Sequence, residues 1–118
     1  MTKKRTARPW GAYTAITTGN GFKVKLVEVL PGKRLSLQRH KFRSEHWVVV
    51  QGIAKITKGD NIVYLKENQS AYIPKKTIHR LENAQKRGKL RIIEVQCGKY
   101  TGEDDIERLE DDHGRVTQ

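Results

Sequence analysis

The sequence has little of several residue types, and each shortage excludes a class of protein. A single cysteine, Cys97, cannot build a disulfide framework. No run approaches the ~18 consecutive apolar residues of a membrane helix. Aromatic residues make up only 7% of the chain, too few for a base-stacking platform. The basic N-terminal residues lead into Pro9-Trp10 rather than into the apolar core of a signal peptide, so we expect a cytoplasmic protein without a membrane contact.

Acidic residues are scarce in most of the chain. The formal net charge is +11, and residues 1–100 carry 22 basic but only 6 acidic side chains, whereas residues 101–118 carry 2 basic and 7 acidic ones. A basic body attracts anions, either nucleic acids or phosphorylated metabolites. After Lys3-Lys4-Arg5 the basic residues are scattered singly along predicted strands, which argues against a dedicated nucleic-acid binder. Many of the lysines are also accounted for by a solvated surface.

No long segment before residue 100 has the 3.6-residue period of a helix. Short runs of Val, Ile, Leu, Thr and Tyr instead alternate with turn signals. Residues 22–29 alternate apolar with polar, and residues 53–57 and 62–65 read as a hairpin. Eight or nine strands in this length predict an all-β single domain, either a double-sheet jelly roll or a small closed barrel. We divide residues 1–118 into a basic arm (1–10), a barrel (11–98) and an acidic tail (99–118). Residues 102–110 of the tail could form a short helix, the alternative being an extended or frayed terminus.

Four side chains have the spacing of a metal site. Alternation places Gln38 and His40 on one face of a strand, and Glu45 begins the returning strand. His79 follows the turn that opens at Pro74. An amide oxygen, two imidazoles and a carboxylate suit one divalent ion such as Zn, Mn, Co, Fe or Ni, and the lack of thiolate disfavours a closed structural zinc.

The neighbouring aromatic and histidine residues have simpler interpretations. His46 alternates away from Glu45 and is expected on the outer face or at an interface, while His113 is expected in solvent. Trp47 could stack on a sugar, although a core position is the commoner role. Trp10 is interpreted as an anchor for the N-terminal arm.

The segment from Gly32 to Gly52 matches the cupin pattern G-x5-H-x-H-x3,4-E-x6-G at every spacing, with Gln38 at the position of the first histidine. The second cupin motif is matched at Pro74, His79 and Asn83. Asn68 and Lys76 replace its two glycines, which implies less tight turns there. The resemblance implies a cupin fold, that is, a double-stranded β-helix or jelly-roll barrel.

A longer resemblance covers nearly the whole chain. It includes the stretches Arg8-Pro9-Trp10-Gly11, Leu35-Ser36-Leu37-Gln38, Glu67-Asn68-Gln69-Ser70, His79-Arg80-Leu81-Glu82-Asn83 and Gly102-Glu103-Asp104-Asp105-Ile106. These stretches are similar to the C-terminal cupin domain of type II mannose-6-phosphate isomerases, usually fused to a GDP-mannose pyrophosphorylase domain and here expected to stand alone. Lys41-Phe42 replaces two histidines typical of that family, and His113 replaces a tyrosine, which bears on substrate preference and turnover.

The resemblance implies interconversion of mannose 6-phosphate and fructose 6-phosphate. The reaction needs an ion that polarises the sugar oxygens, a base that moves a proton between C1 and C2, and cations for the phosphate. Candidates for the base are Glu94, Asp104 and Asp105; Glu94 has the alternative of pairing with a neighbouring Arg or Lys on its sheet. Phosphate candidates, each of which could also be an ordinary surface residue, are Arg8, Lys41, Arg43, Arg80, Arg108 and Arg115.

Two other functions stay open at this stage. One is a non-catalytic module that binds a sugar phosphate or nucleotide sugar, or that assists a separate GDP-mannose pyrophosphorylase. The other is nucleic-acid binding, which predicts a steeply salt-dependent affinity. A chain of this size has little core to spare, so we also expect a homodimer.

Overall fold

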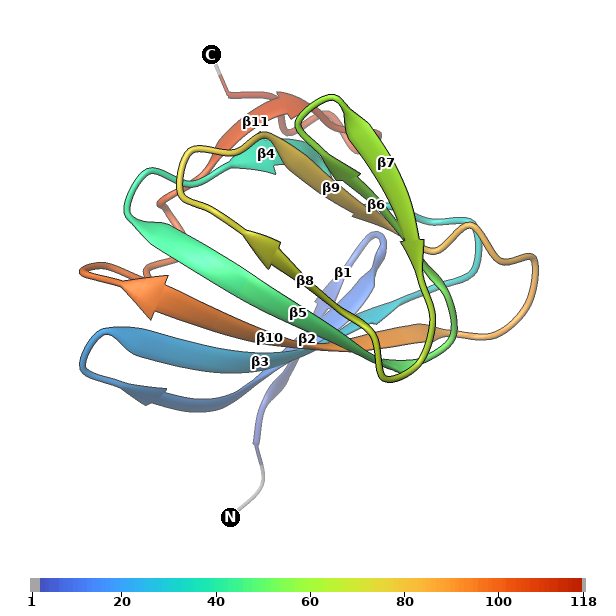
Figure 1. Ribbon diagram of the computed structural model, residues 1–118, viewed down its shortest axis with the longest axis horizontal. Helices are drawn as coiled ribbons and strands as arrows, with labels where there is room; N and C mark the ends of the chain where they lie inside the picture. Colours follow the sequence, from blue (N-terminus) through green and yellow to red (C-terminus); the bar gives the residue numbers. More distant parts are fainter. Residues whose placement is uncertain (1–2, 118) are drawn as a thin grey trace.

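The computed structural model describes residues 3–117 and folds them into two antiparallel β-sheets that face each other (Figure 1). The described residues contain no helix, so none is available to cross a membrane. The all-β prediction is therefore confirmed. The strands are β1 (Arg5–Arg8), β2 (Gly11–Gly19), β3 (Phe22–Val29), β4 (Leu37–Arg39), β5 (Arg43–Gln51), β6 (Ala54–Lys58), β7 (Asn61–Leu65), β8 (Ser70–Ile73), β9 (His79–Glu82), β10 (Leu90–Gly98) and β11 (Glu107–Glu110).

The larger sheet has the order β1-β2-β3-β10-β5-β8, and the smaller sheet has the order β11-β4-β9-β6-β7. Side chains alternate between the two faces of each strand, so every second residue points between the sheets. The core between them includes Val27, Val49, Ile56, Leu81 and Ile92, each at most 4% exposed. This apolar packing closes one part of the space between the sheets and leaves a polar pocket in the other.

The acidic tail is extended rather than helical. Its strand β11 pairs antiparallel with β4, with Glu107 opposite Arg39 and Arg108 opposite Gln38. Glu107 also accepts a hydrogen bond from Arg39 at 2.6 Å. Pairing with an exposed edge and with arginines on the neighbouring strands stabilises the extended form, so the helical alternative for residues 102–110 is wrong and the extended one holds.

The structure has more strands than the sequence predicts, eleven in the described residues rather than eight or nine. The additional strands include short ones at sheet edges, such as β1 and β11, whose four-residue sequences carry no clear alternation. The residues at the two lost glycine positions, Asn68 and Lys76, adopt positive φ of 73° and 66°. They therefore keep the left-handed conformation that glycine adopts most easily, contrary to the expectation of looser turns.

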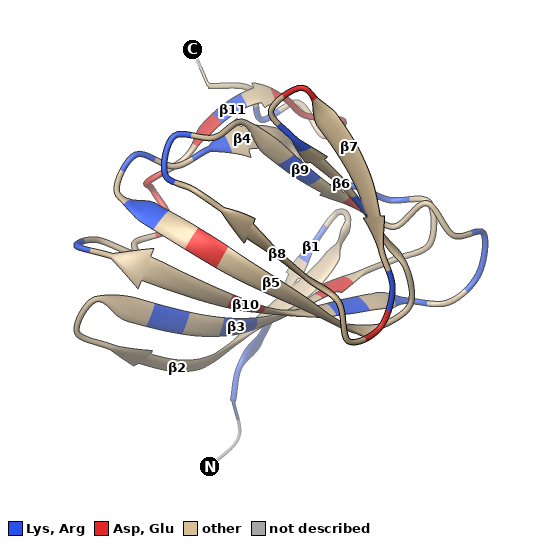
Figure 2. Cartoon of the chain, in the orientation of Figure 1, with Lys and Arg blue, Asp and Glu red and all other residues tan. Residues whose placement is uncertain are grey.

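The outer face of the larger sheet carries a mainly apolar stretch on its central strands, beside the ion pairs of Glu28 with Arg5 and Arg91, whereas the second face of an antiparallel sheet is commonly solvated and polar. On the three central strands β3, β10 and β5, cross-strand partners form two rows on this face. These rows, which we call the outer apolar strip, consist of Leu26, Ile93 and Val48 in one and Val24, Val95 and His46 in the other. Basic side chains, in contrast, are distributed over strands and loops of both sheets (Figure 2).

Candidate functional site

A pocket between the two sheets gathers most of the predicted site residues. Strands β3, β5 and β10 form one wall, β4 and β9 contribute to the other, and the acidic tail reaches the same space. The pocket holds both signs of charge beside apolar core residues, because the inward positions of its strands carry ionisable side chains. Its polar lining includes Arg8, Lys25, Gln38, His40, Arg43, Glu45, Glu94, Glu103, Arg108 and Arg115.

Three of the four predicted ligands meet at one point. One nitrogen each of His40 and His79 and one carboxylate oxygen of Glu45 lie within 4.8 Å of one another. His40 follows β4, Glu45 lies near the start of β5, and His79 begins β9. Gln38 is paired with His79 across β4 and β9 and is also buried in the pocket. The four side chains are 8%, 3%, 1% and 1% exposed in chain order.

Backbone carbonyls orient both imidazoles. Nδ1 of His40 lies 2.7 Å from the carbonyl oxygen of Asp105, and Nδ1 of His79 lies 2.8 Å from that of Thr77. A carbonyl can only accept, so each Nδ1 carries the proton and each Nε2 presents a lone pair to the site. This is the usual way in which a second contact fixes a metal-binding histidine. Among residues 3–117, Nε2 of His79 is buried without a hydrogen-bond partner, so its lone pair is free to coordinate a metal ion.

Burial and charge keep the imidazoles in the form that binds metal. Burial lowers the pKa of His40 to about 4, and the positive charge of Arg43 acts in the same direction. Burial also lowers the pKa of His79. Both rings are therefore neutral near pH 7. Neutral imidazole nitrogens, a carboxylate and an amide oxygen fit a borderline divalent ion.

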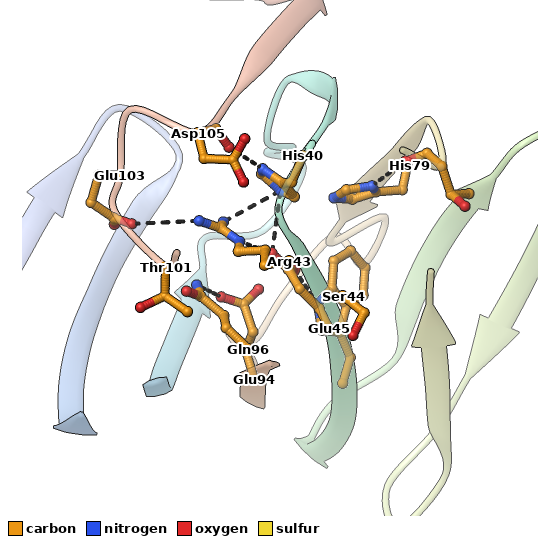
Figure 3. A network of polar contacts seen from close by, with 12 residues as sticks. His40, Arg43, Ser44, Glu45, His79, Glu94, Gln96, Thr101, Glu103 and Asp105 are labelled. Carbon is orange, nitrogen blue, oxygen red and sulfur yellow. Dashed lines mark hydrogen bonds and ion pairs between the residues drawn. The ribbon is translucent and has the colours of Figure 1, made fainter. Parts of the chain in front are cut away.

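The carboxylate of Glu45 is held on both sides (Figure 3). Oε1 accepts a hydrogen bond from Nε1 of Trp47 at 2.8 Å, and Oε2 accepts one from Nε of Arg43 at the same distance. Trp47 is a core residue and also lines the pocket, so it fixes Glu45 from the apolar side. The core position expected for Trp47 is therefore confirmed, and stacking on a sugar stays a prediction.

Glu94 on β10 is the base candidate that the structure brings into the pocket. It is buried on the same strand face as Leu90, Ile92 and Gln96, as the alternation predicts. Burial raises the pKa of Glu94 to about 7, and the negative charge of Glu45 adds to the effect. Nε2 of Gln96 donates a hydrogen bond to Glu94 at 2.8 Å. No ion pair of Glu94 occurs within 4.0 Å among residues 3–117, so the alternative of a paired strand residue is not what the structure shows.

The other two base candidates occupy different positions. Asp104 is exposed and accepts a hydrogen bond from the hydroxyl of Tyr100. Both carboxylate oxygens of Asp105 accept backbone N–H groups, those of Lys41 and Phe42, at 2.9 Å. Asp105 is therefore placed to hold the turn after His40 rather than to reach a substrate.

The predicted cations separate into two groups. Arg8, Arg43, Arg108 and Arg115 line the pocket. Arg80 points to the other side of its sheet, where it donates to the carbonyl of Leu35 and to the carboxylate of Glu110 at 2.9 and 2.6 Å. Lys41 is exposed above the ring of Phe42. The structure thus does not bring Arg80 or Lys41 into this pocket. Arg80 lies on the outward face of β9, and Lys41 is exposed in the bend between β4 and β5.

Arg108 differs from the other three arginines that line the pocket. Its Nε is buried and has no hydrogen-bond partner within the described part of the chain. Burial lowers the pKa of Arg108, and the positive charges of Arg115 and Arg8 act in the same direction. Arg115 is also held by Asp111, with its Nε 2.8 Å from the carboxylate. Crowded cations with unused donors form a site that an anion would stabilise.

Lys25 and Glu103 are pocket residues that the sequence reasoning missed. Lys25 is only 6% exposed, forms an ion pair with Glu103, and lies 4.1 Å from the centre of the Tyr13 ring. The signal was present in the alternation of residues 22–29, because Lys25 shares its strand face with Val27 and Val29. A lysine on an apolar inward face indicates a charged pocket.

Three further expectations have clear outcomes. His46 is exposed, on the outer face as predicted, and stacks near Tyr72. Trp10 is 5% exposed within the core, as expected of an anchor. The expectation for His113 is wrong, because its side chain is half-buried and its Nε2 is enclosed. The tail folds back on itself there, with N–H of Gly114 donating to the carbonyl of Asp111.

Comparison with solved structures supports the fold. The chain superposes on the capsular polysaccharide assembling protein CapF from Staphylococcus aureus with a TM-score of 0.80 and 21% identity, covering 93% of this chain and 33% of that one. An RmlC-like cupin from Shewanella frigidimarina gives a TM-score of 0.75 and 14% identity, covering 86% and 87%. At these identities the likeness shows the fold alone, which confirms the predicted cupin barrel.

Sequence comparison shows the family. The chain is 54% identical over 113 residues to the xanthan biosynthesis protein XanB of Xanthomonas campestris and 55% identical over 111 residues to the alginate biosynthesis protein AlgA of Pseudomonas aeruginosa. These alignments cover 96% and 94% of this chain but 24% and 23% of the relatives, so the chain spans about a quarter of their length. A family model described as "Mannose-6-phosphate isomerase C-terminal" matches residues 1–111. The chain therefore belongs to the mannose-6-phosphate isomerase C-terminal family.

Proposed function

We propose that this domain interconverts mannose 6-phosphate and fructose 6-phosphate, using one divalent ion of the Zn, Mn, Co, Fe or Ni type. Gln38, His40, Glu45 and His79 would hold the ion, and when bound it would polarise the sugar oxygens at C1 and C2. The observation that carries the proposal is the unpartnered, buried Nε2 of His79 facing His40 and Glu45. Burying a nitrogen without a partner is costly unless a ligand satisfies it.

Glu94 is proposed as the base that removes a proton from one carbon and returns it to the other. A carboxyl whose pKa is raised to about 7 can exist in either protonation state near neutral pH, which suits both halves of the transfer. Glu94 lines the same pocket as His40 and Glu45 but takes its hydrogen bond from Gln96. It is thus close to the site without being one of the three converging ligands.

Arg8, Arg108 and Arg115 are proposed to bind the phosphate. They come from β1, β11 and the tail after β11, and all three line the pocket together with Gln38, His40 and Glu45. Guanidinium groups bind phosphate oxygens in pairs, and the unused buried Nε of Arg108 provides a donor. A dianion would also relieve the repulsion among the three cations.

The test is a coupled assay for fructose 6-phosphate formed from mannose 6-phosphate, with each candidate metal supplied in turn. His40→Ala and His79→Ala should abolish metal-dependent turnover, whereas the matched control His46→Ala, a histidine on the outer face, should leave it intact. Turnover that is unaffected by both site substitutions would refute the proposed role of the ion.

A second candidate function is a non-catalytic module that binds a sugar phosphate or nucleotide sugar, or that assists a separate pyrophosphorylase. It is favoured by Lys41-Phe42, which replaces two histidines of the resembling family; Phe42 is 44% exposed and its ring meets that of Tyr100 at 6.4 Å. One relative, 50% identical over 105 residues, is a mannose-1-phosphate guanylyltransferase from Sinorhizobium fredii. Metal-dependent binding of the sugar phosphate without turnover would support the module.

A further inference from the structure

Arg43 is bound to the atoms that would hold the ion. It lies at the start of β5 and is only 7% exposed. Its Nε is 2.8 Å from Oε2 of Glu45, and its Nη2 is 3.3 Å from Nε2 of His40. Figure 3 shows the guanidinium on one side of His40 and Glu45, with the imidazole of His79 on the other.

The tautomer of His40 allows its Nε2 to bind either Arg43 or a metal ion, but not both. Because Nδ1 donates its proton to the carbonyl of Asp105, Nε2 has a single lone pair and no proton. Arg43 can only donate, so its Nη2–H points at that lone pair. A divalent ion needs the same lone pair for coordination. Arg43 and the ion therefore cannot both bind Nε2 of His40.

The tail offers the displaced guanidinium other partners. Nη1 of Arg43 is already 3.4 Å from the carbonyl of Gly102 and 4.0 Å from the carboxylate of Glu103. Glu103 lines the pocket and lies on the opposite side of Arg43 from His79 (Figure 3). Turning toward Gly102 and Glu103 would release Nε2 of His40 while the positive charge of Arg43 stays paired.

We propose that Arg43 is a built-in competitor of the divalent ion, holding His40 and Glu45 in place in the ion-free protein and turning toward Gly102 and Glu103 when the ion binds. The proposal rests on the ion site of the proposed function. It adds that the ion must break the hydrogen bond from Arg43 to His40 before it can bind, which lowers its affinity. It also makes Arg43 a positioning residue for the two ligands, since without a cation the buried Glu45 carboxylate loses its charge partner.

The test measures ion binding rather than activity. Titration of the full chain with Zn²⁺ or Co²⁺, followed by calorimetry or by Co²⁺ absorption, compares wild type with Arg43→Met. The variant should bind about tenfold more tightly, because the ion no longer displaces a charge-assisted hydrogen bond. Lys25→Met is the matched control, since it removes one positive charge from the same pocket without touching His40 or Glu45; its gain in affinity should be clearly smaller.

The outcomes separate this inference from the proposed function. If His79→Ala abolishes ion binding but Arg43→Met binds no more tightly than Lys25→Met, the site stands and the competition is overturned. If the wild type binds no ion, both fail. A measurement on the wild type covers the case in which Arg43→Met does not fold: the NMR signal of the Arg43 Nε–H group should shift on addition of Zn²⁺, and an unchanged signal in the presence of bound ion would overturn the proposal.

Discussion

The carbonyl oxygen of Asp105 accepts a hydrogen bond from Nδ1 of His40 at 2.7 Å, while the carboxylate of the same residue holds the two backbone N–H groups that follow His40 in sequence. One tail residue thus fixes both the tautomer of a candidate ligand and the turn that carries it. The acidic tail, which composition alone marks as different from the body, is therefore part of the site.

Replacing Asp105 by Ala should weaken ion binding. The turn at Lys41 and Phe42 would lose both of its carboxylate contacts, and His40 would be less firmly oriented. Loss of a supporting contact of this kind typically costs 10–100-fold in metal affinity. The measurement is a Zn²⁺ titration of the purified variant. Asp104→Ala is the control, because Asp104 is exposed and contacts Tyr100 instead; equal affinities for the two variants would contradict the proposed role of Asp105.

Replacing Arg108 by Gln should raise KM for the sugar phosphate at least tenfold while leaving ion affinity unchanged. The amide is uncharged and cannot form the paired contacts of a guanidinium with phosphate. The assay is steady-state kinetics, or direct binding if there is no turnover, together with competition by inorganic phosphate. Arg39→Gln on the neighbouring strand is the control, since Arg39 pairs with Glu107 and is absent from the pocket lining. A normal KM for Arg108→Gln would place the phosphate elsewhere.

Acid should remove a stabilising contact of the tail. Burial raises the pKa of Asp111, but the hydrogen bonds from Arg115 outweigh it and lower the pKa to about 2, from an ordinary value of 3.8. A depressed folded-state pKa contributes stability that is fully present above the unfolded-state value and is lost as pH falls from about 3.8 through about 2. Urea unfolding of wild type and Asp111→Asn should differ by a constant free energy at pH 5–7 and converge toward pH 2. A difference that persists at pH 2 would contradict this.

The predicted homodimer should form through the outer apolar strip. The larger sheet has six strands, and at ~4.8 Å spacing and ~3.3 Å per residue its face measures roughly 24 by 26 Å, about 620 Å², which is below the ~800 Å² per partner of a standard interface but in the range of a small one. Sheets also pack face to face readily. Sedimentation should show a dimer that Val95→Glu converts to a monomer, with Ile62→Glu, on exposed β7 of the other sheet, as the control. A monomeric wild type at ~100 μM would refute the prediction.

Strand periodicity and spacing predicted the barrel and the convergence of His40, Glu45 and His79, because these features depend on local alternation and on turns. The face of each residue follows from its parity along the strand. The same rule would have found Lys25, whose neighbours on the inward face are apolar. The position of Lys25 in the pocket could therefore have been predicted from the alternation of residues 22–29.

Long-range pairing explains what the sequence could not show. Whether a given arginine reaches the pocket depends on which strand lies beside it: Arg108 enters because β11 pairs with β4, while Arg80, one residue after His79, necessarily faces the opposite way. The extended form of the tail depends on the same pairing. Neither the partner strand nor its register is encoded in the local pattern of residues 107–110.

The pocket takes cations from segments at opposite ends of the chain, Arg8 before the barrel strands and Arg108 and Arg115 after them. The residues of the apolar core all lie between Trp10 and Ile92, so they precede Arg108 and Arg115 in the chain. A protease cut between Gly98 and Glu107 would leave every core residue on one fragment and separate Arg108 and Arg115 from it. The apolar core and two of the pocket's arginines thus depend on different segments of the chain.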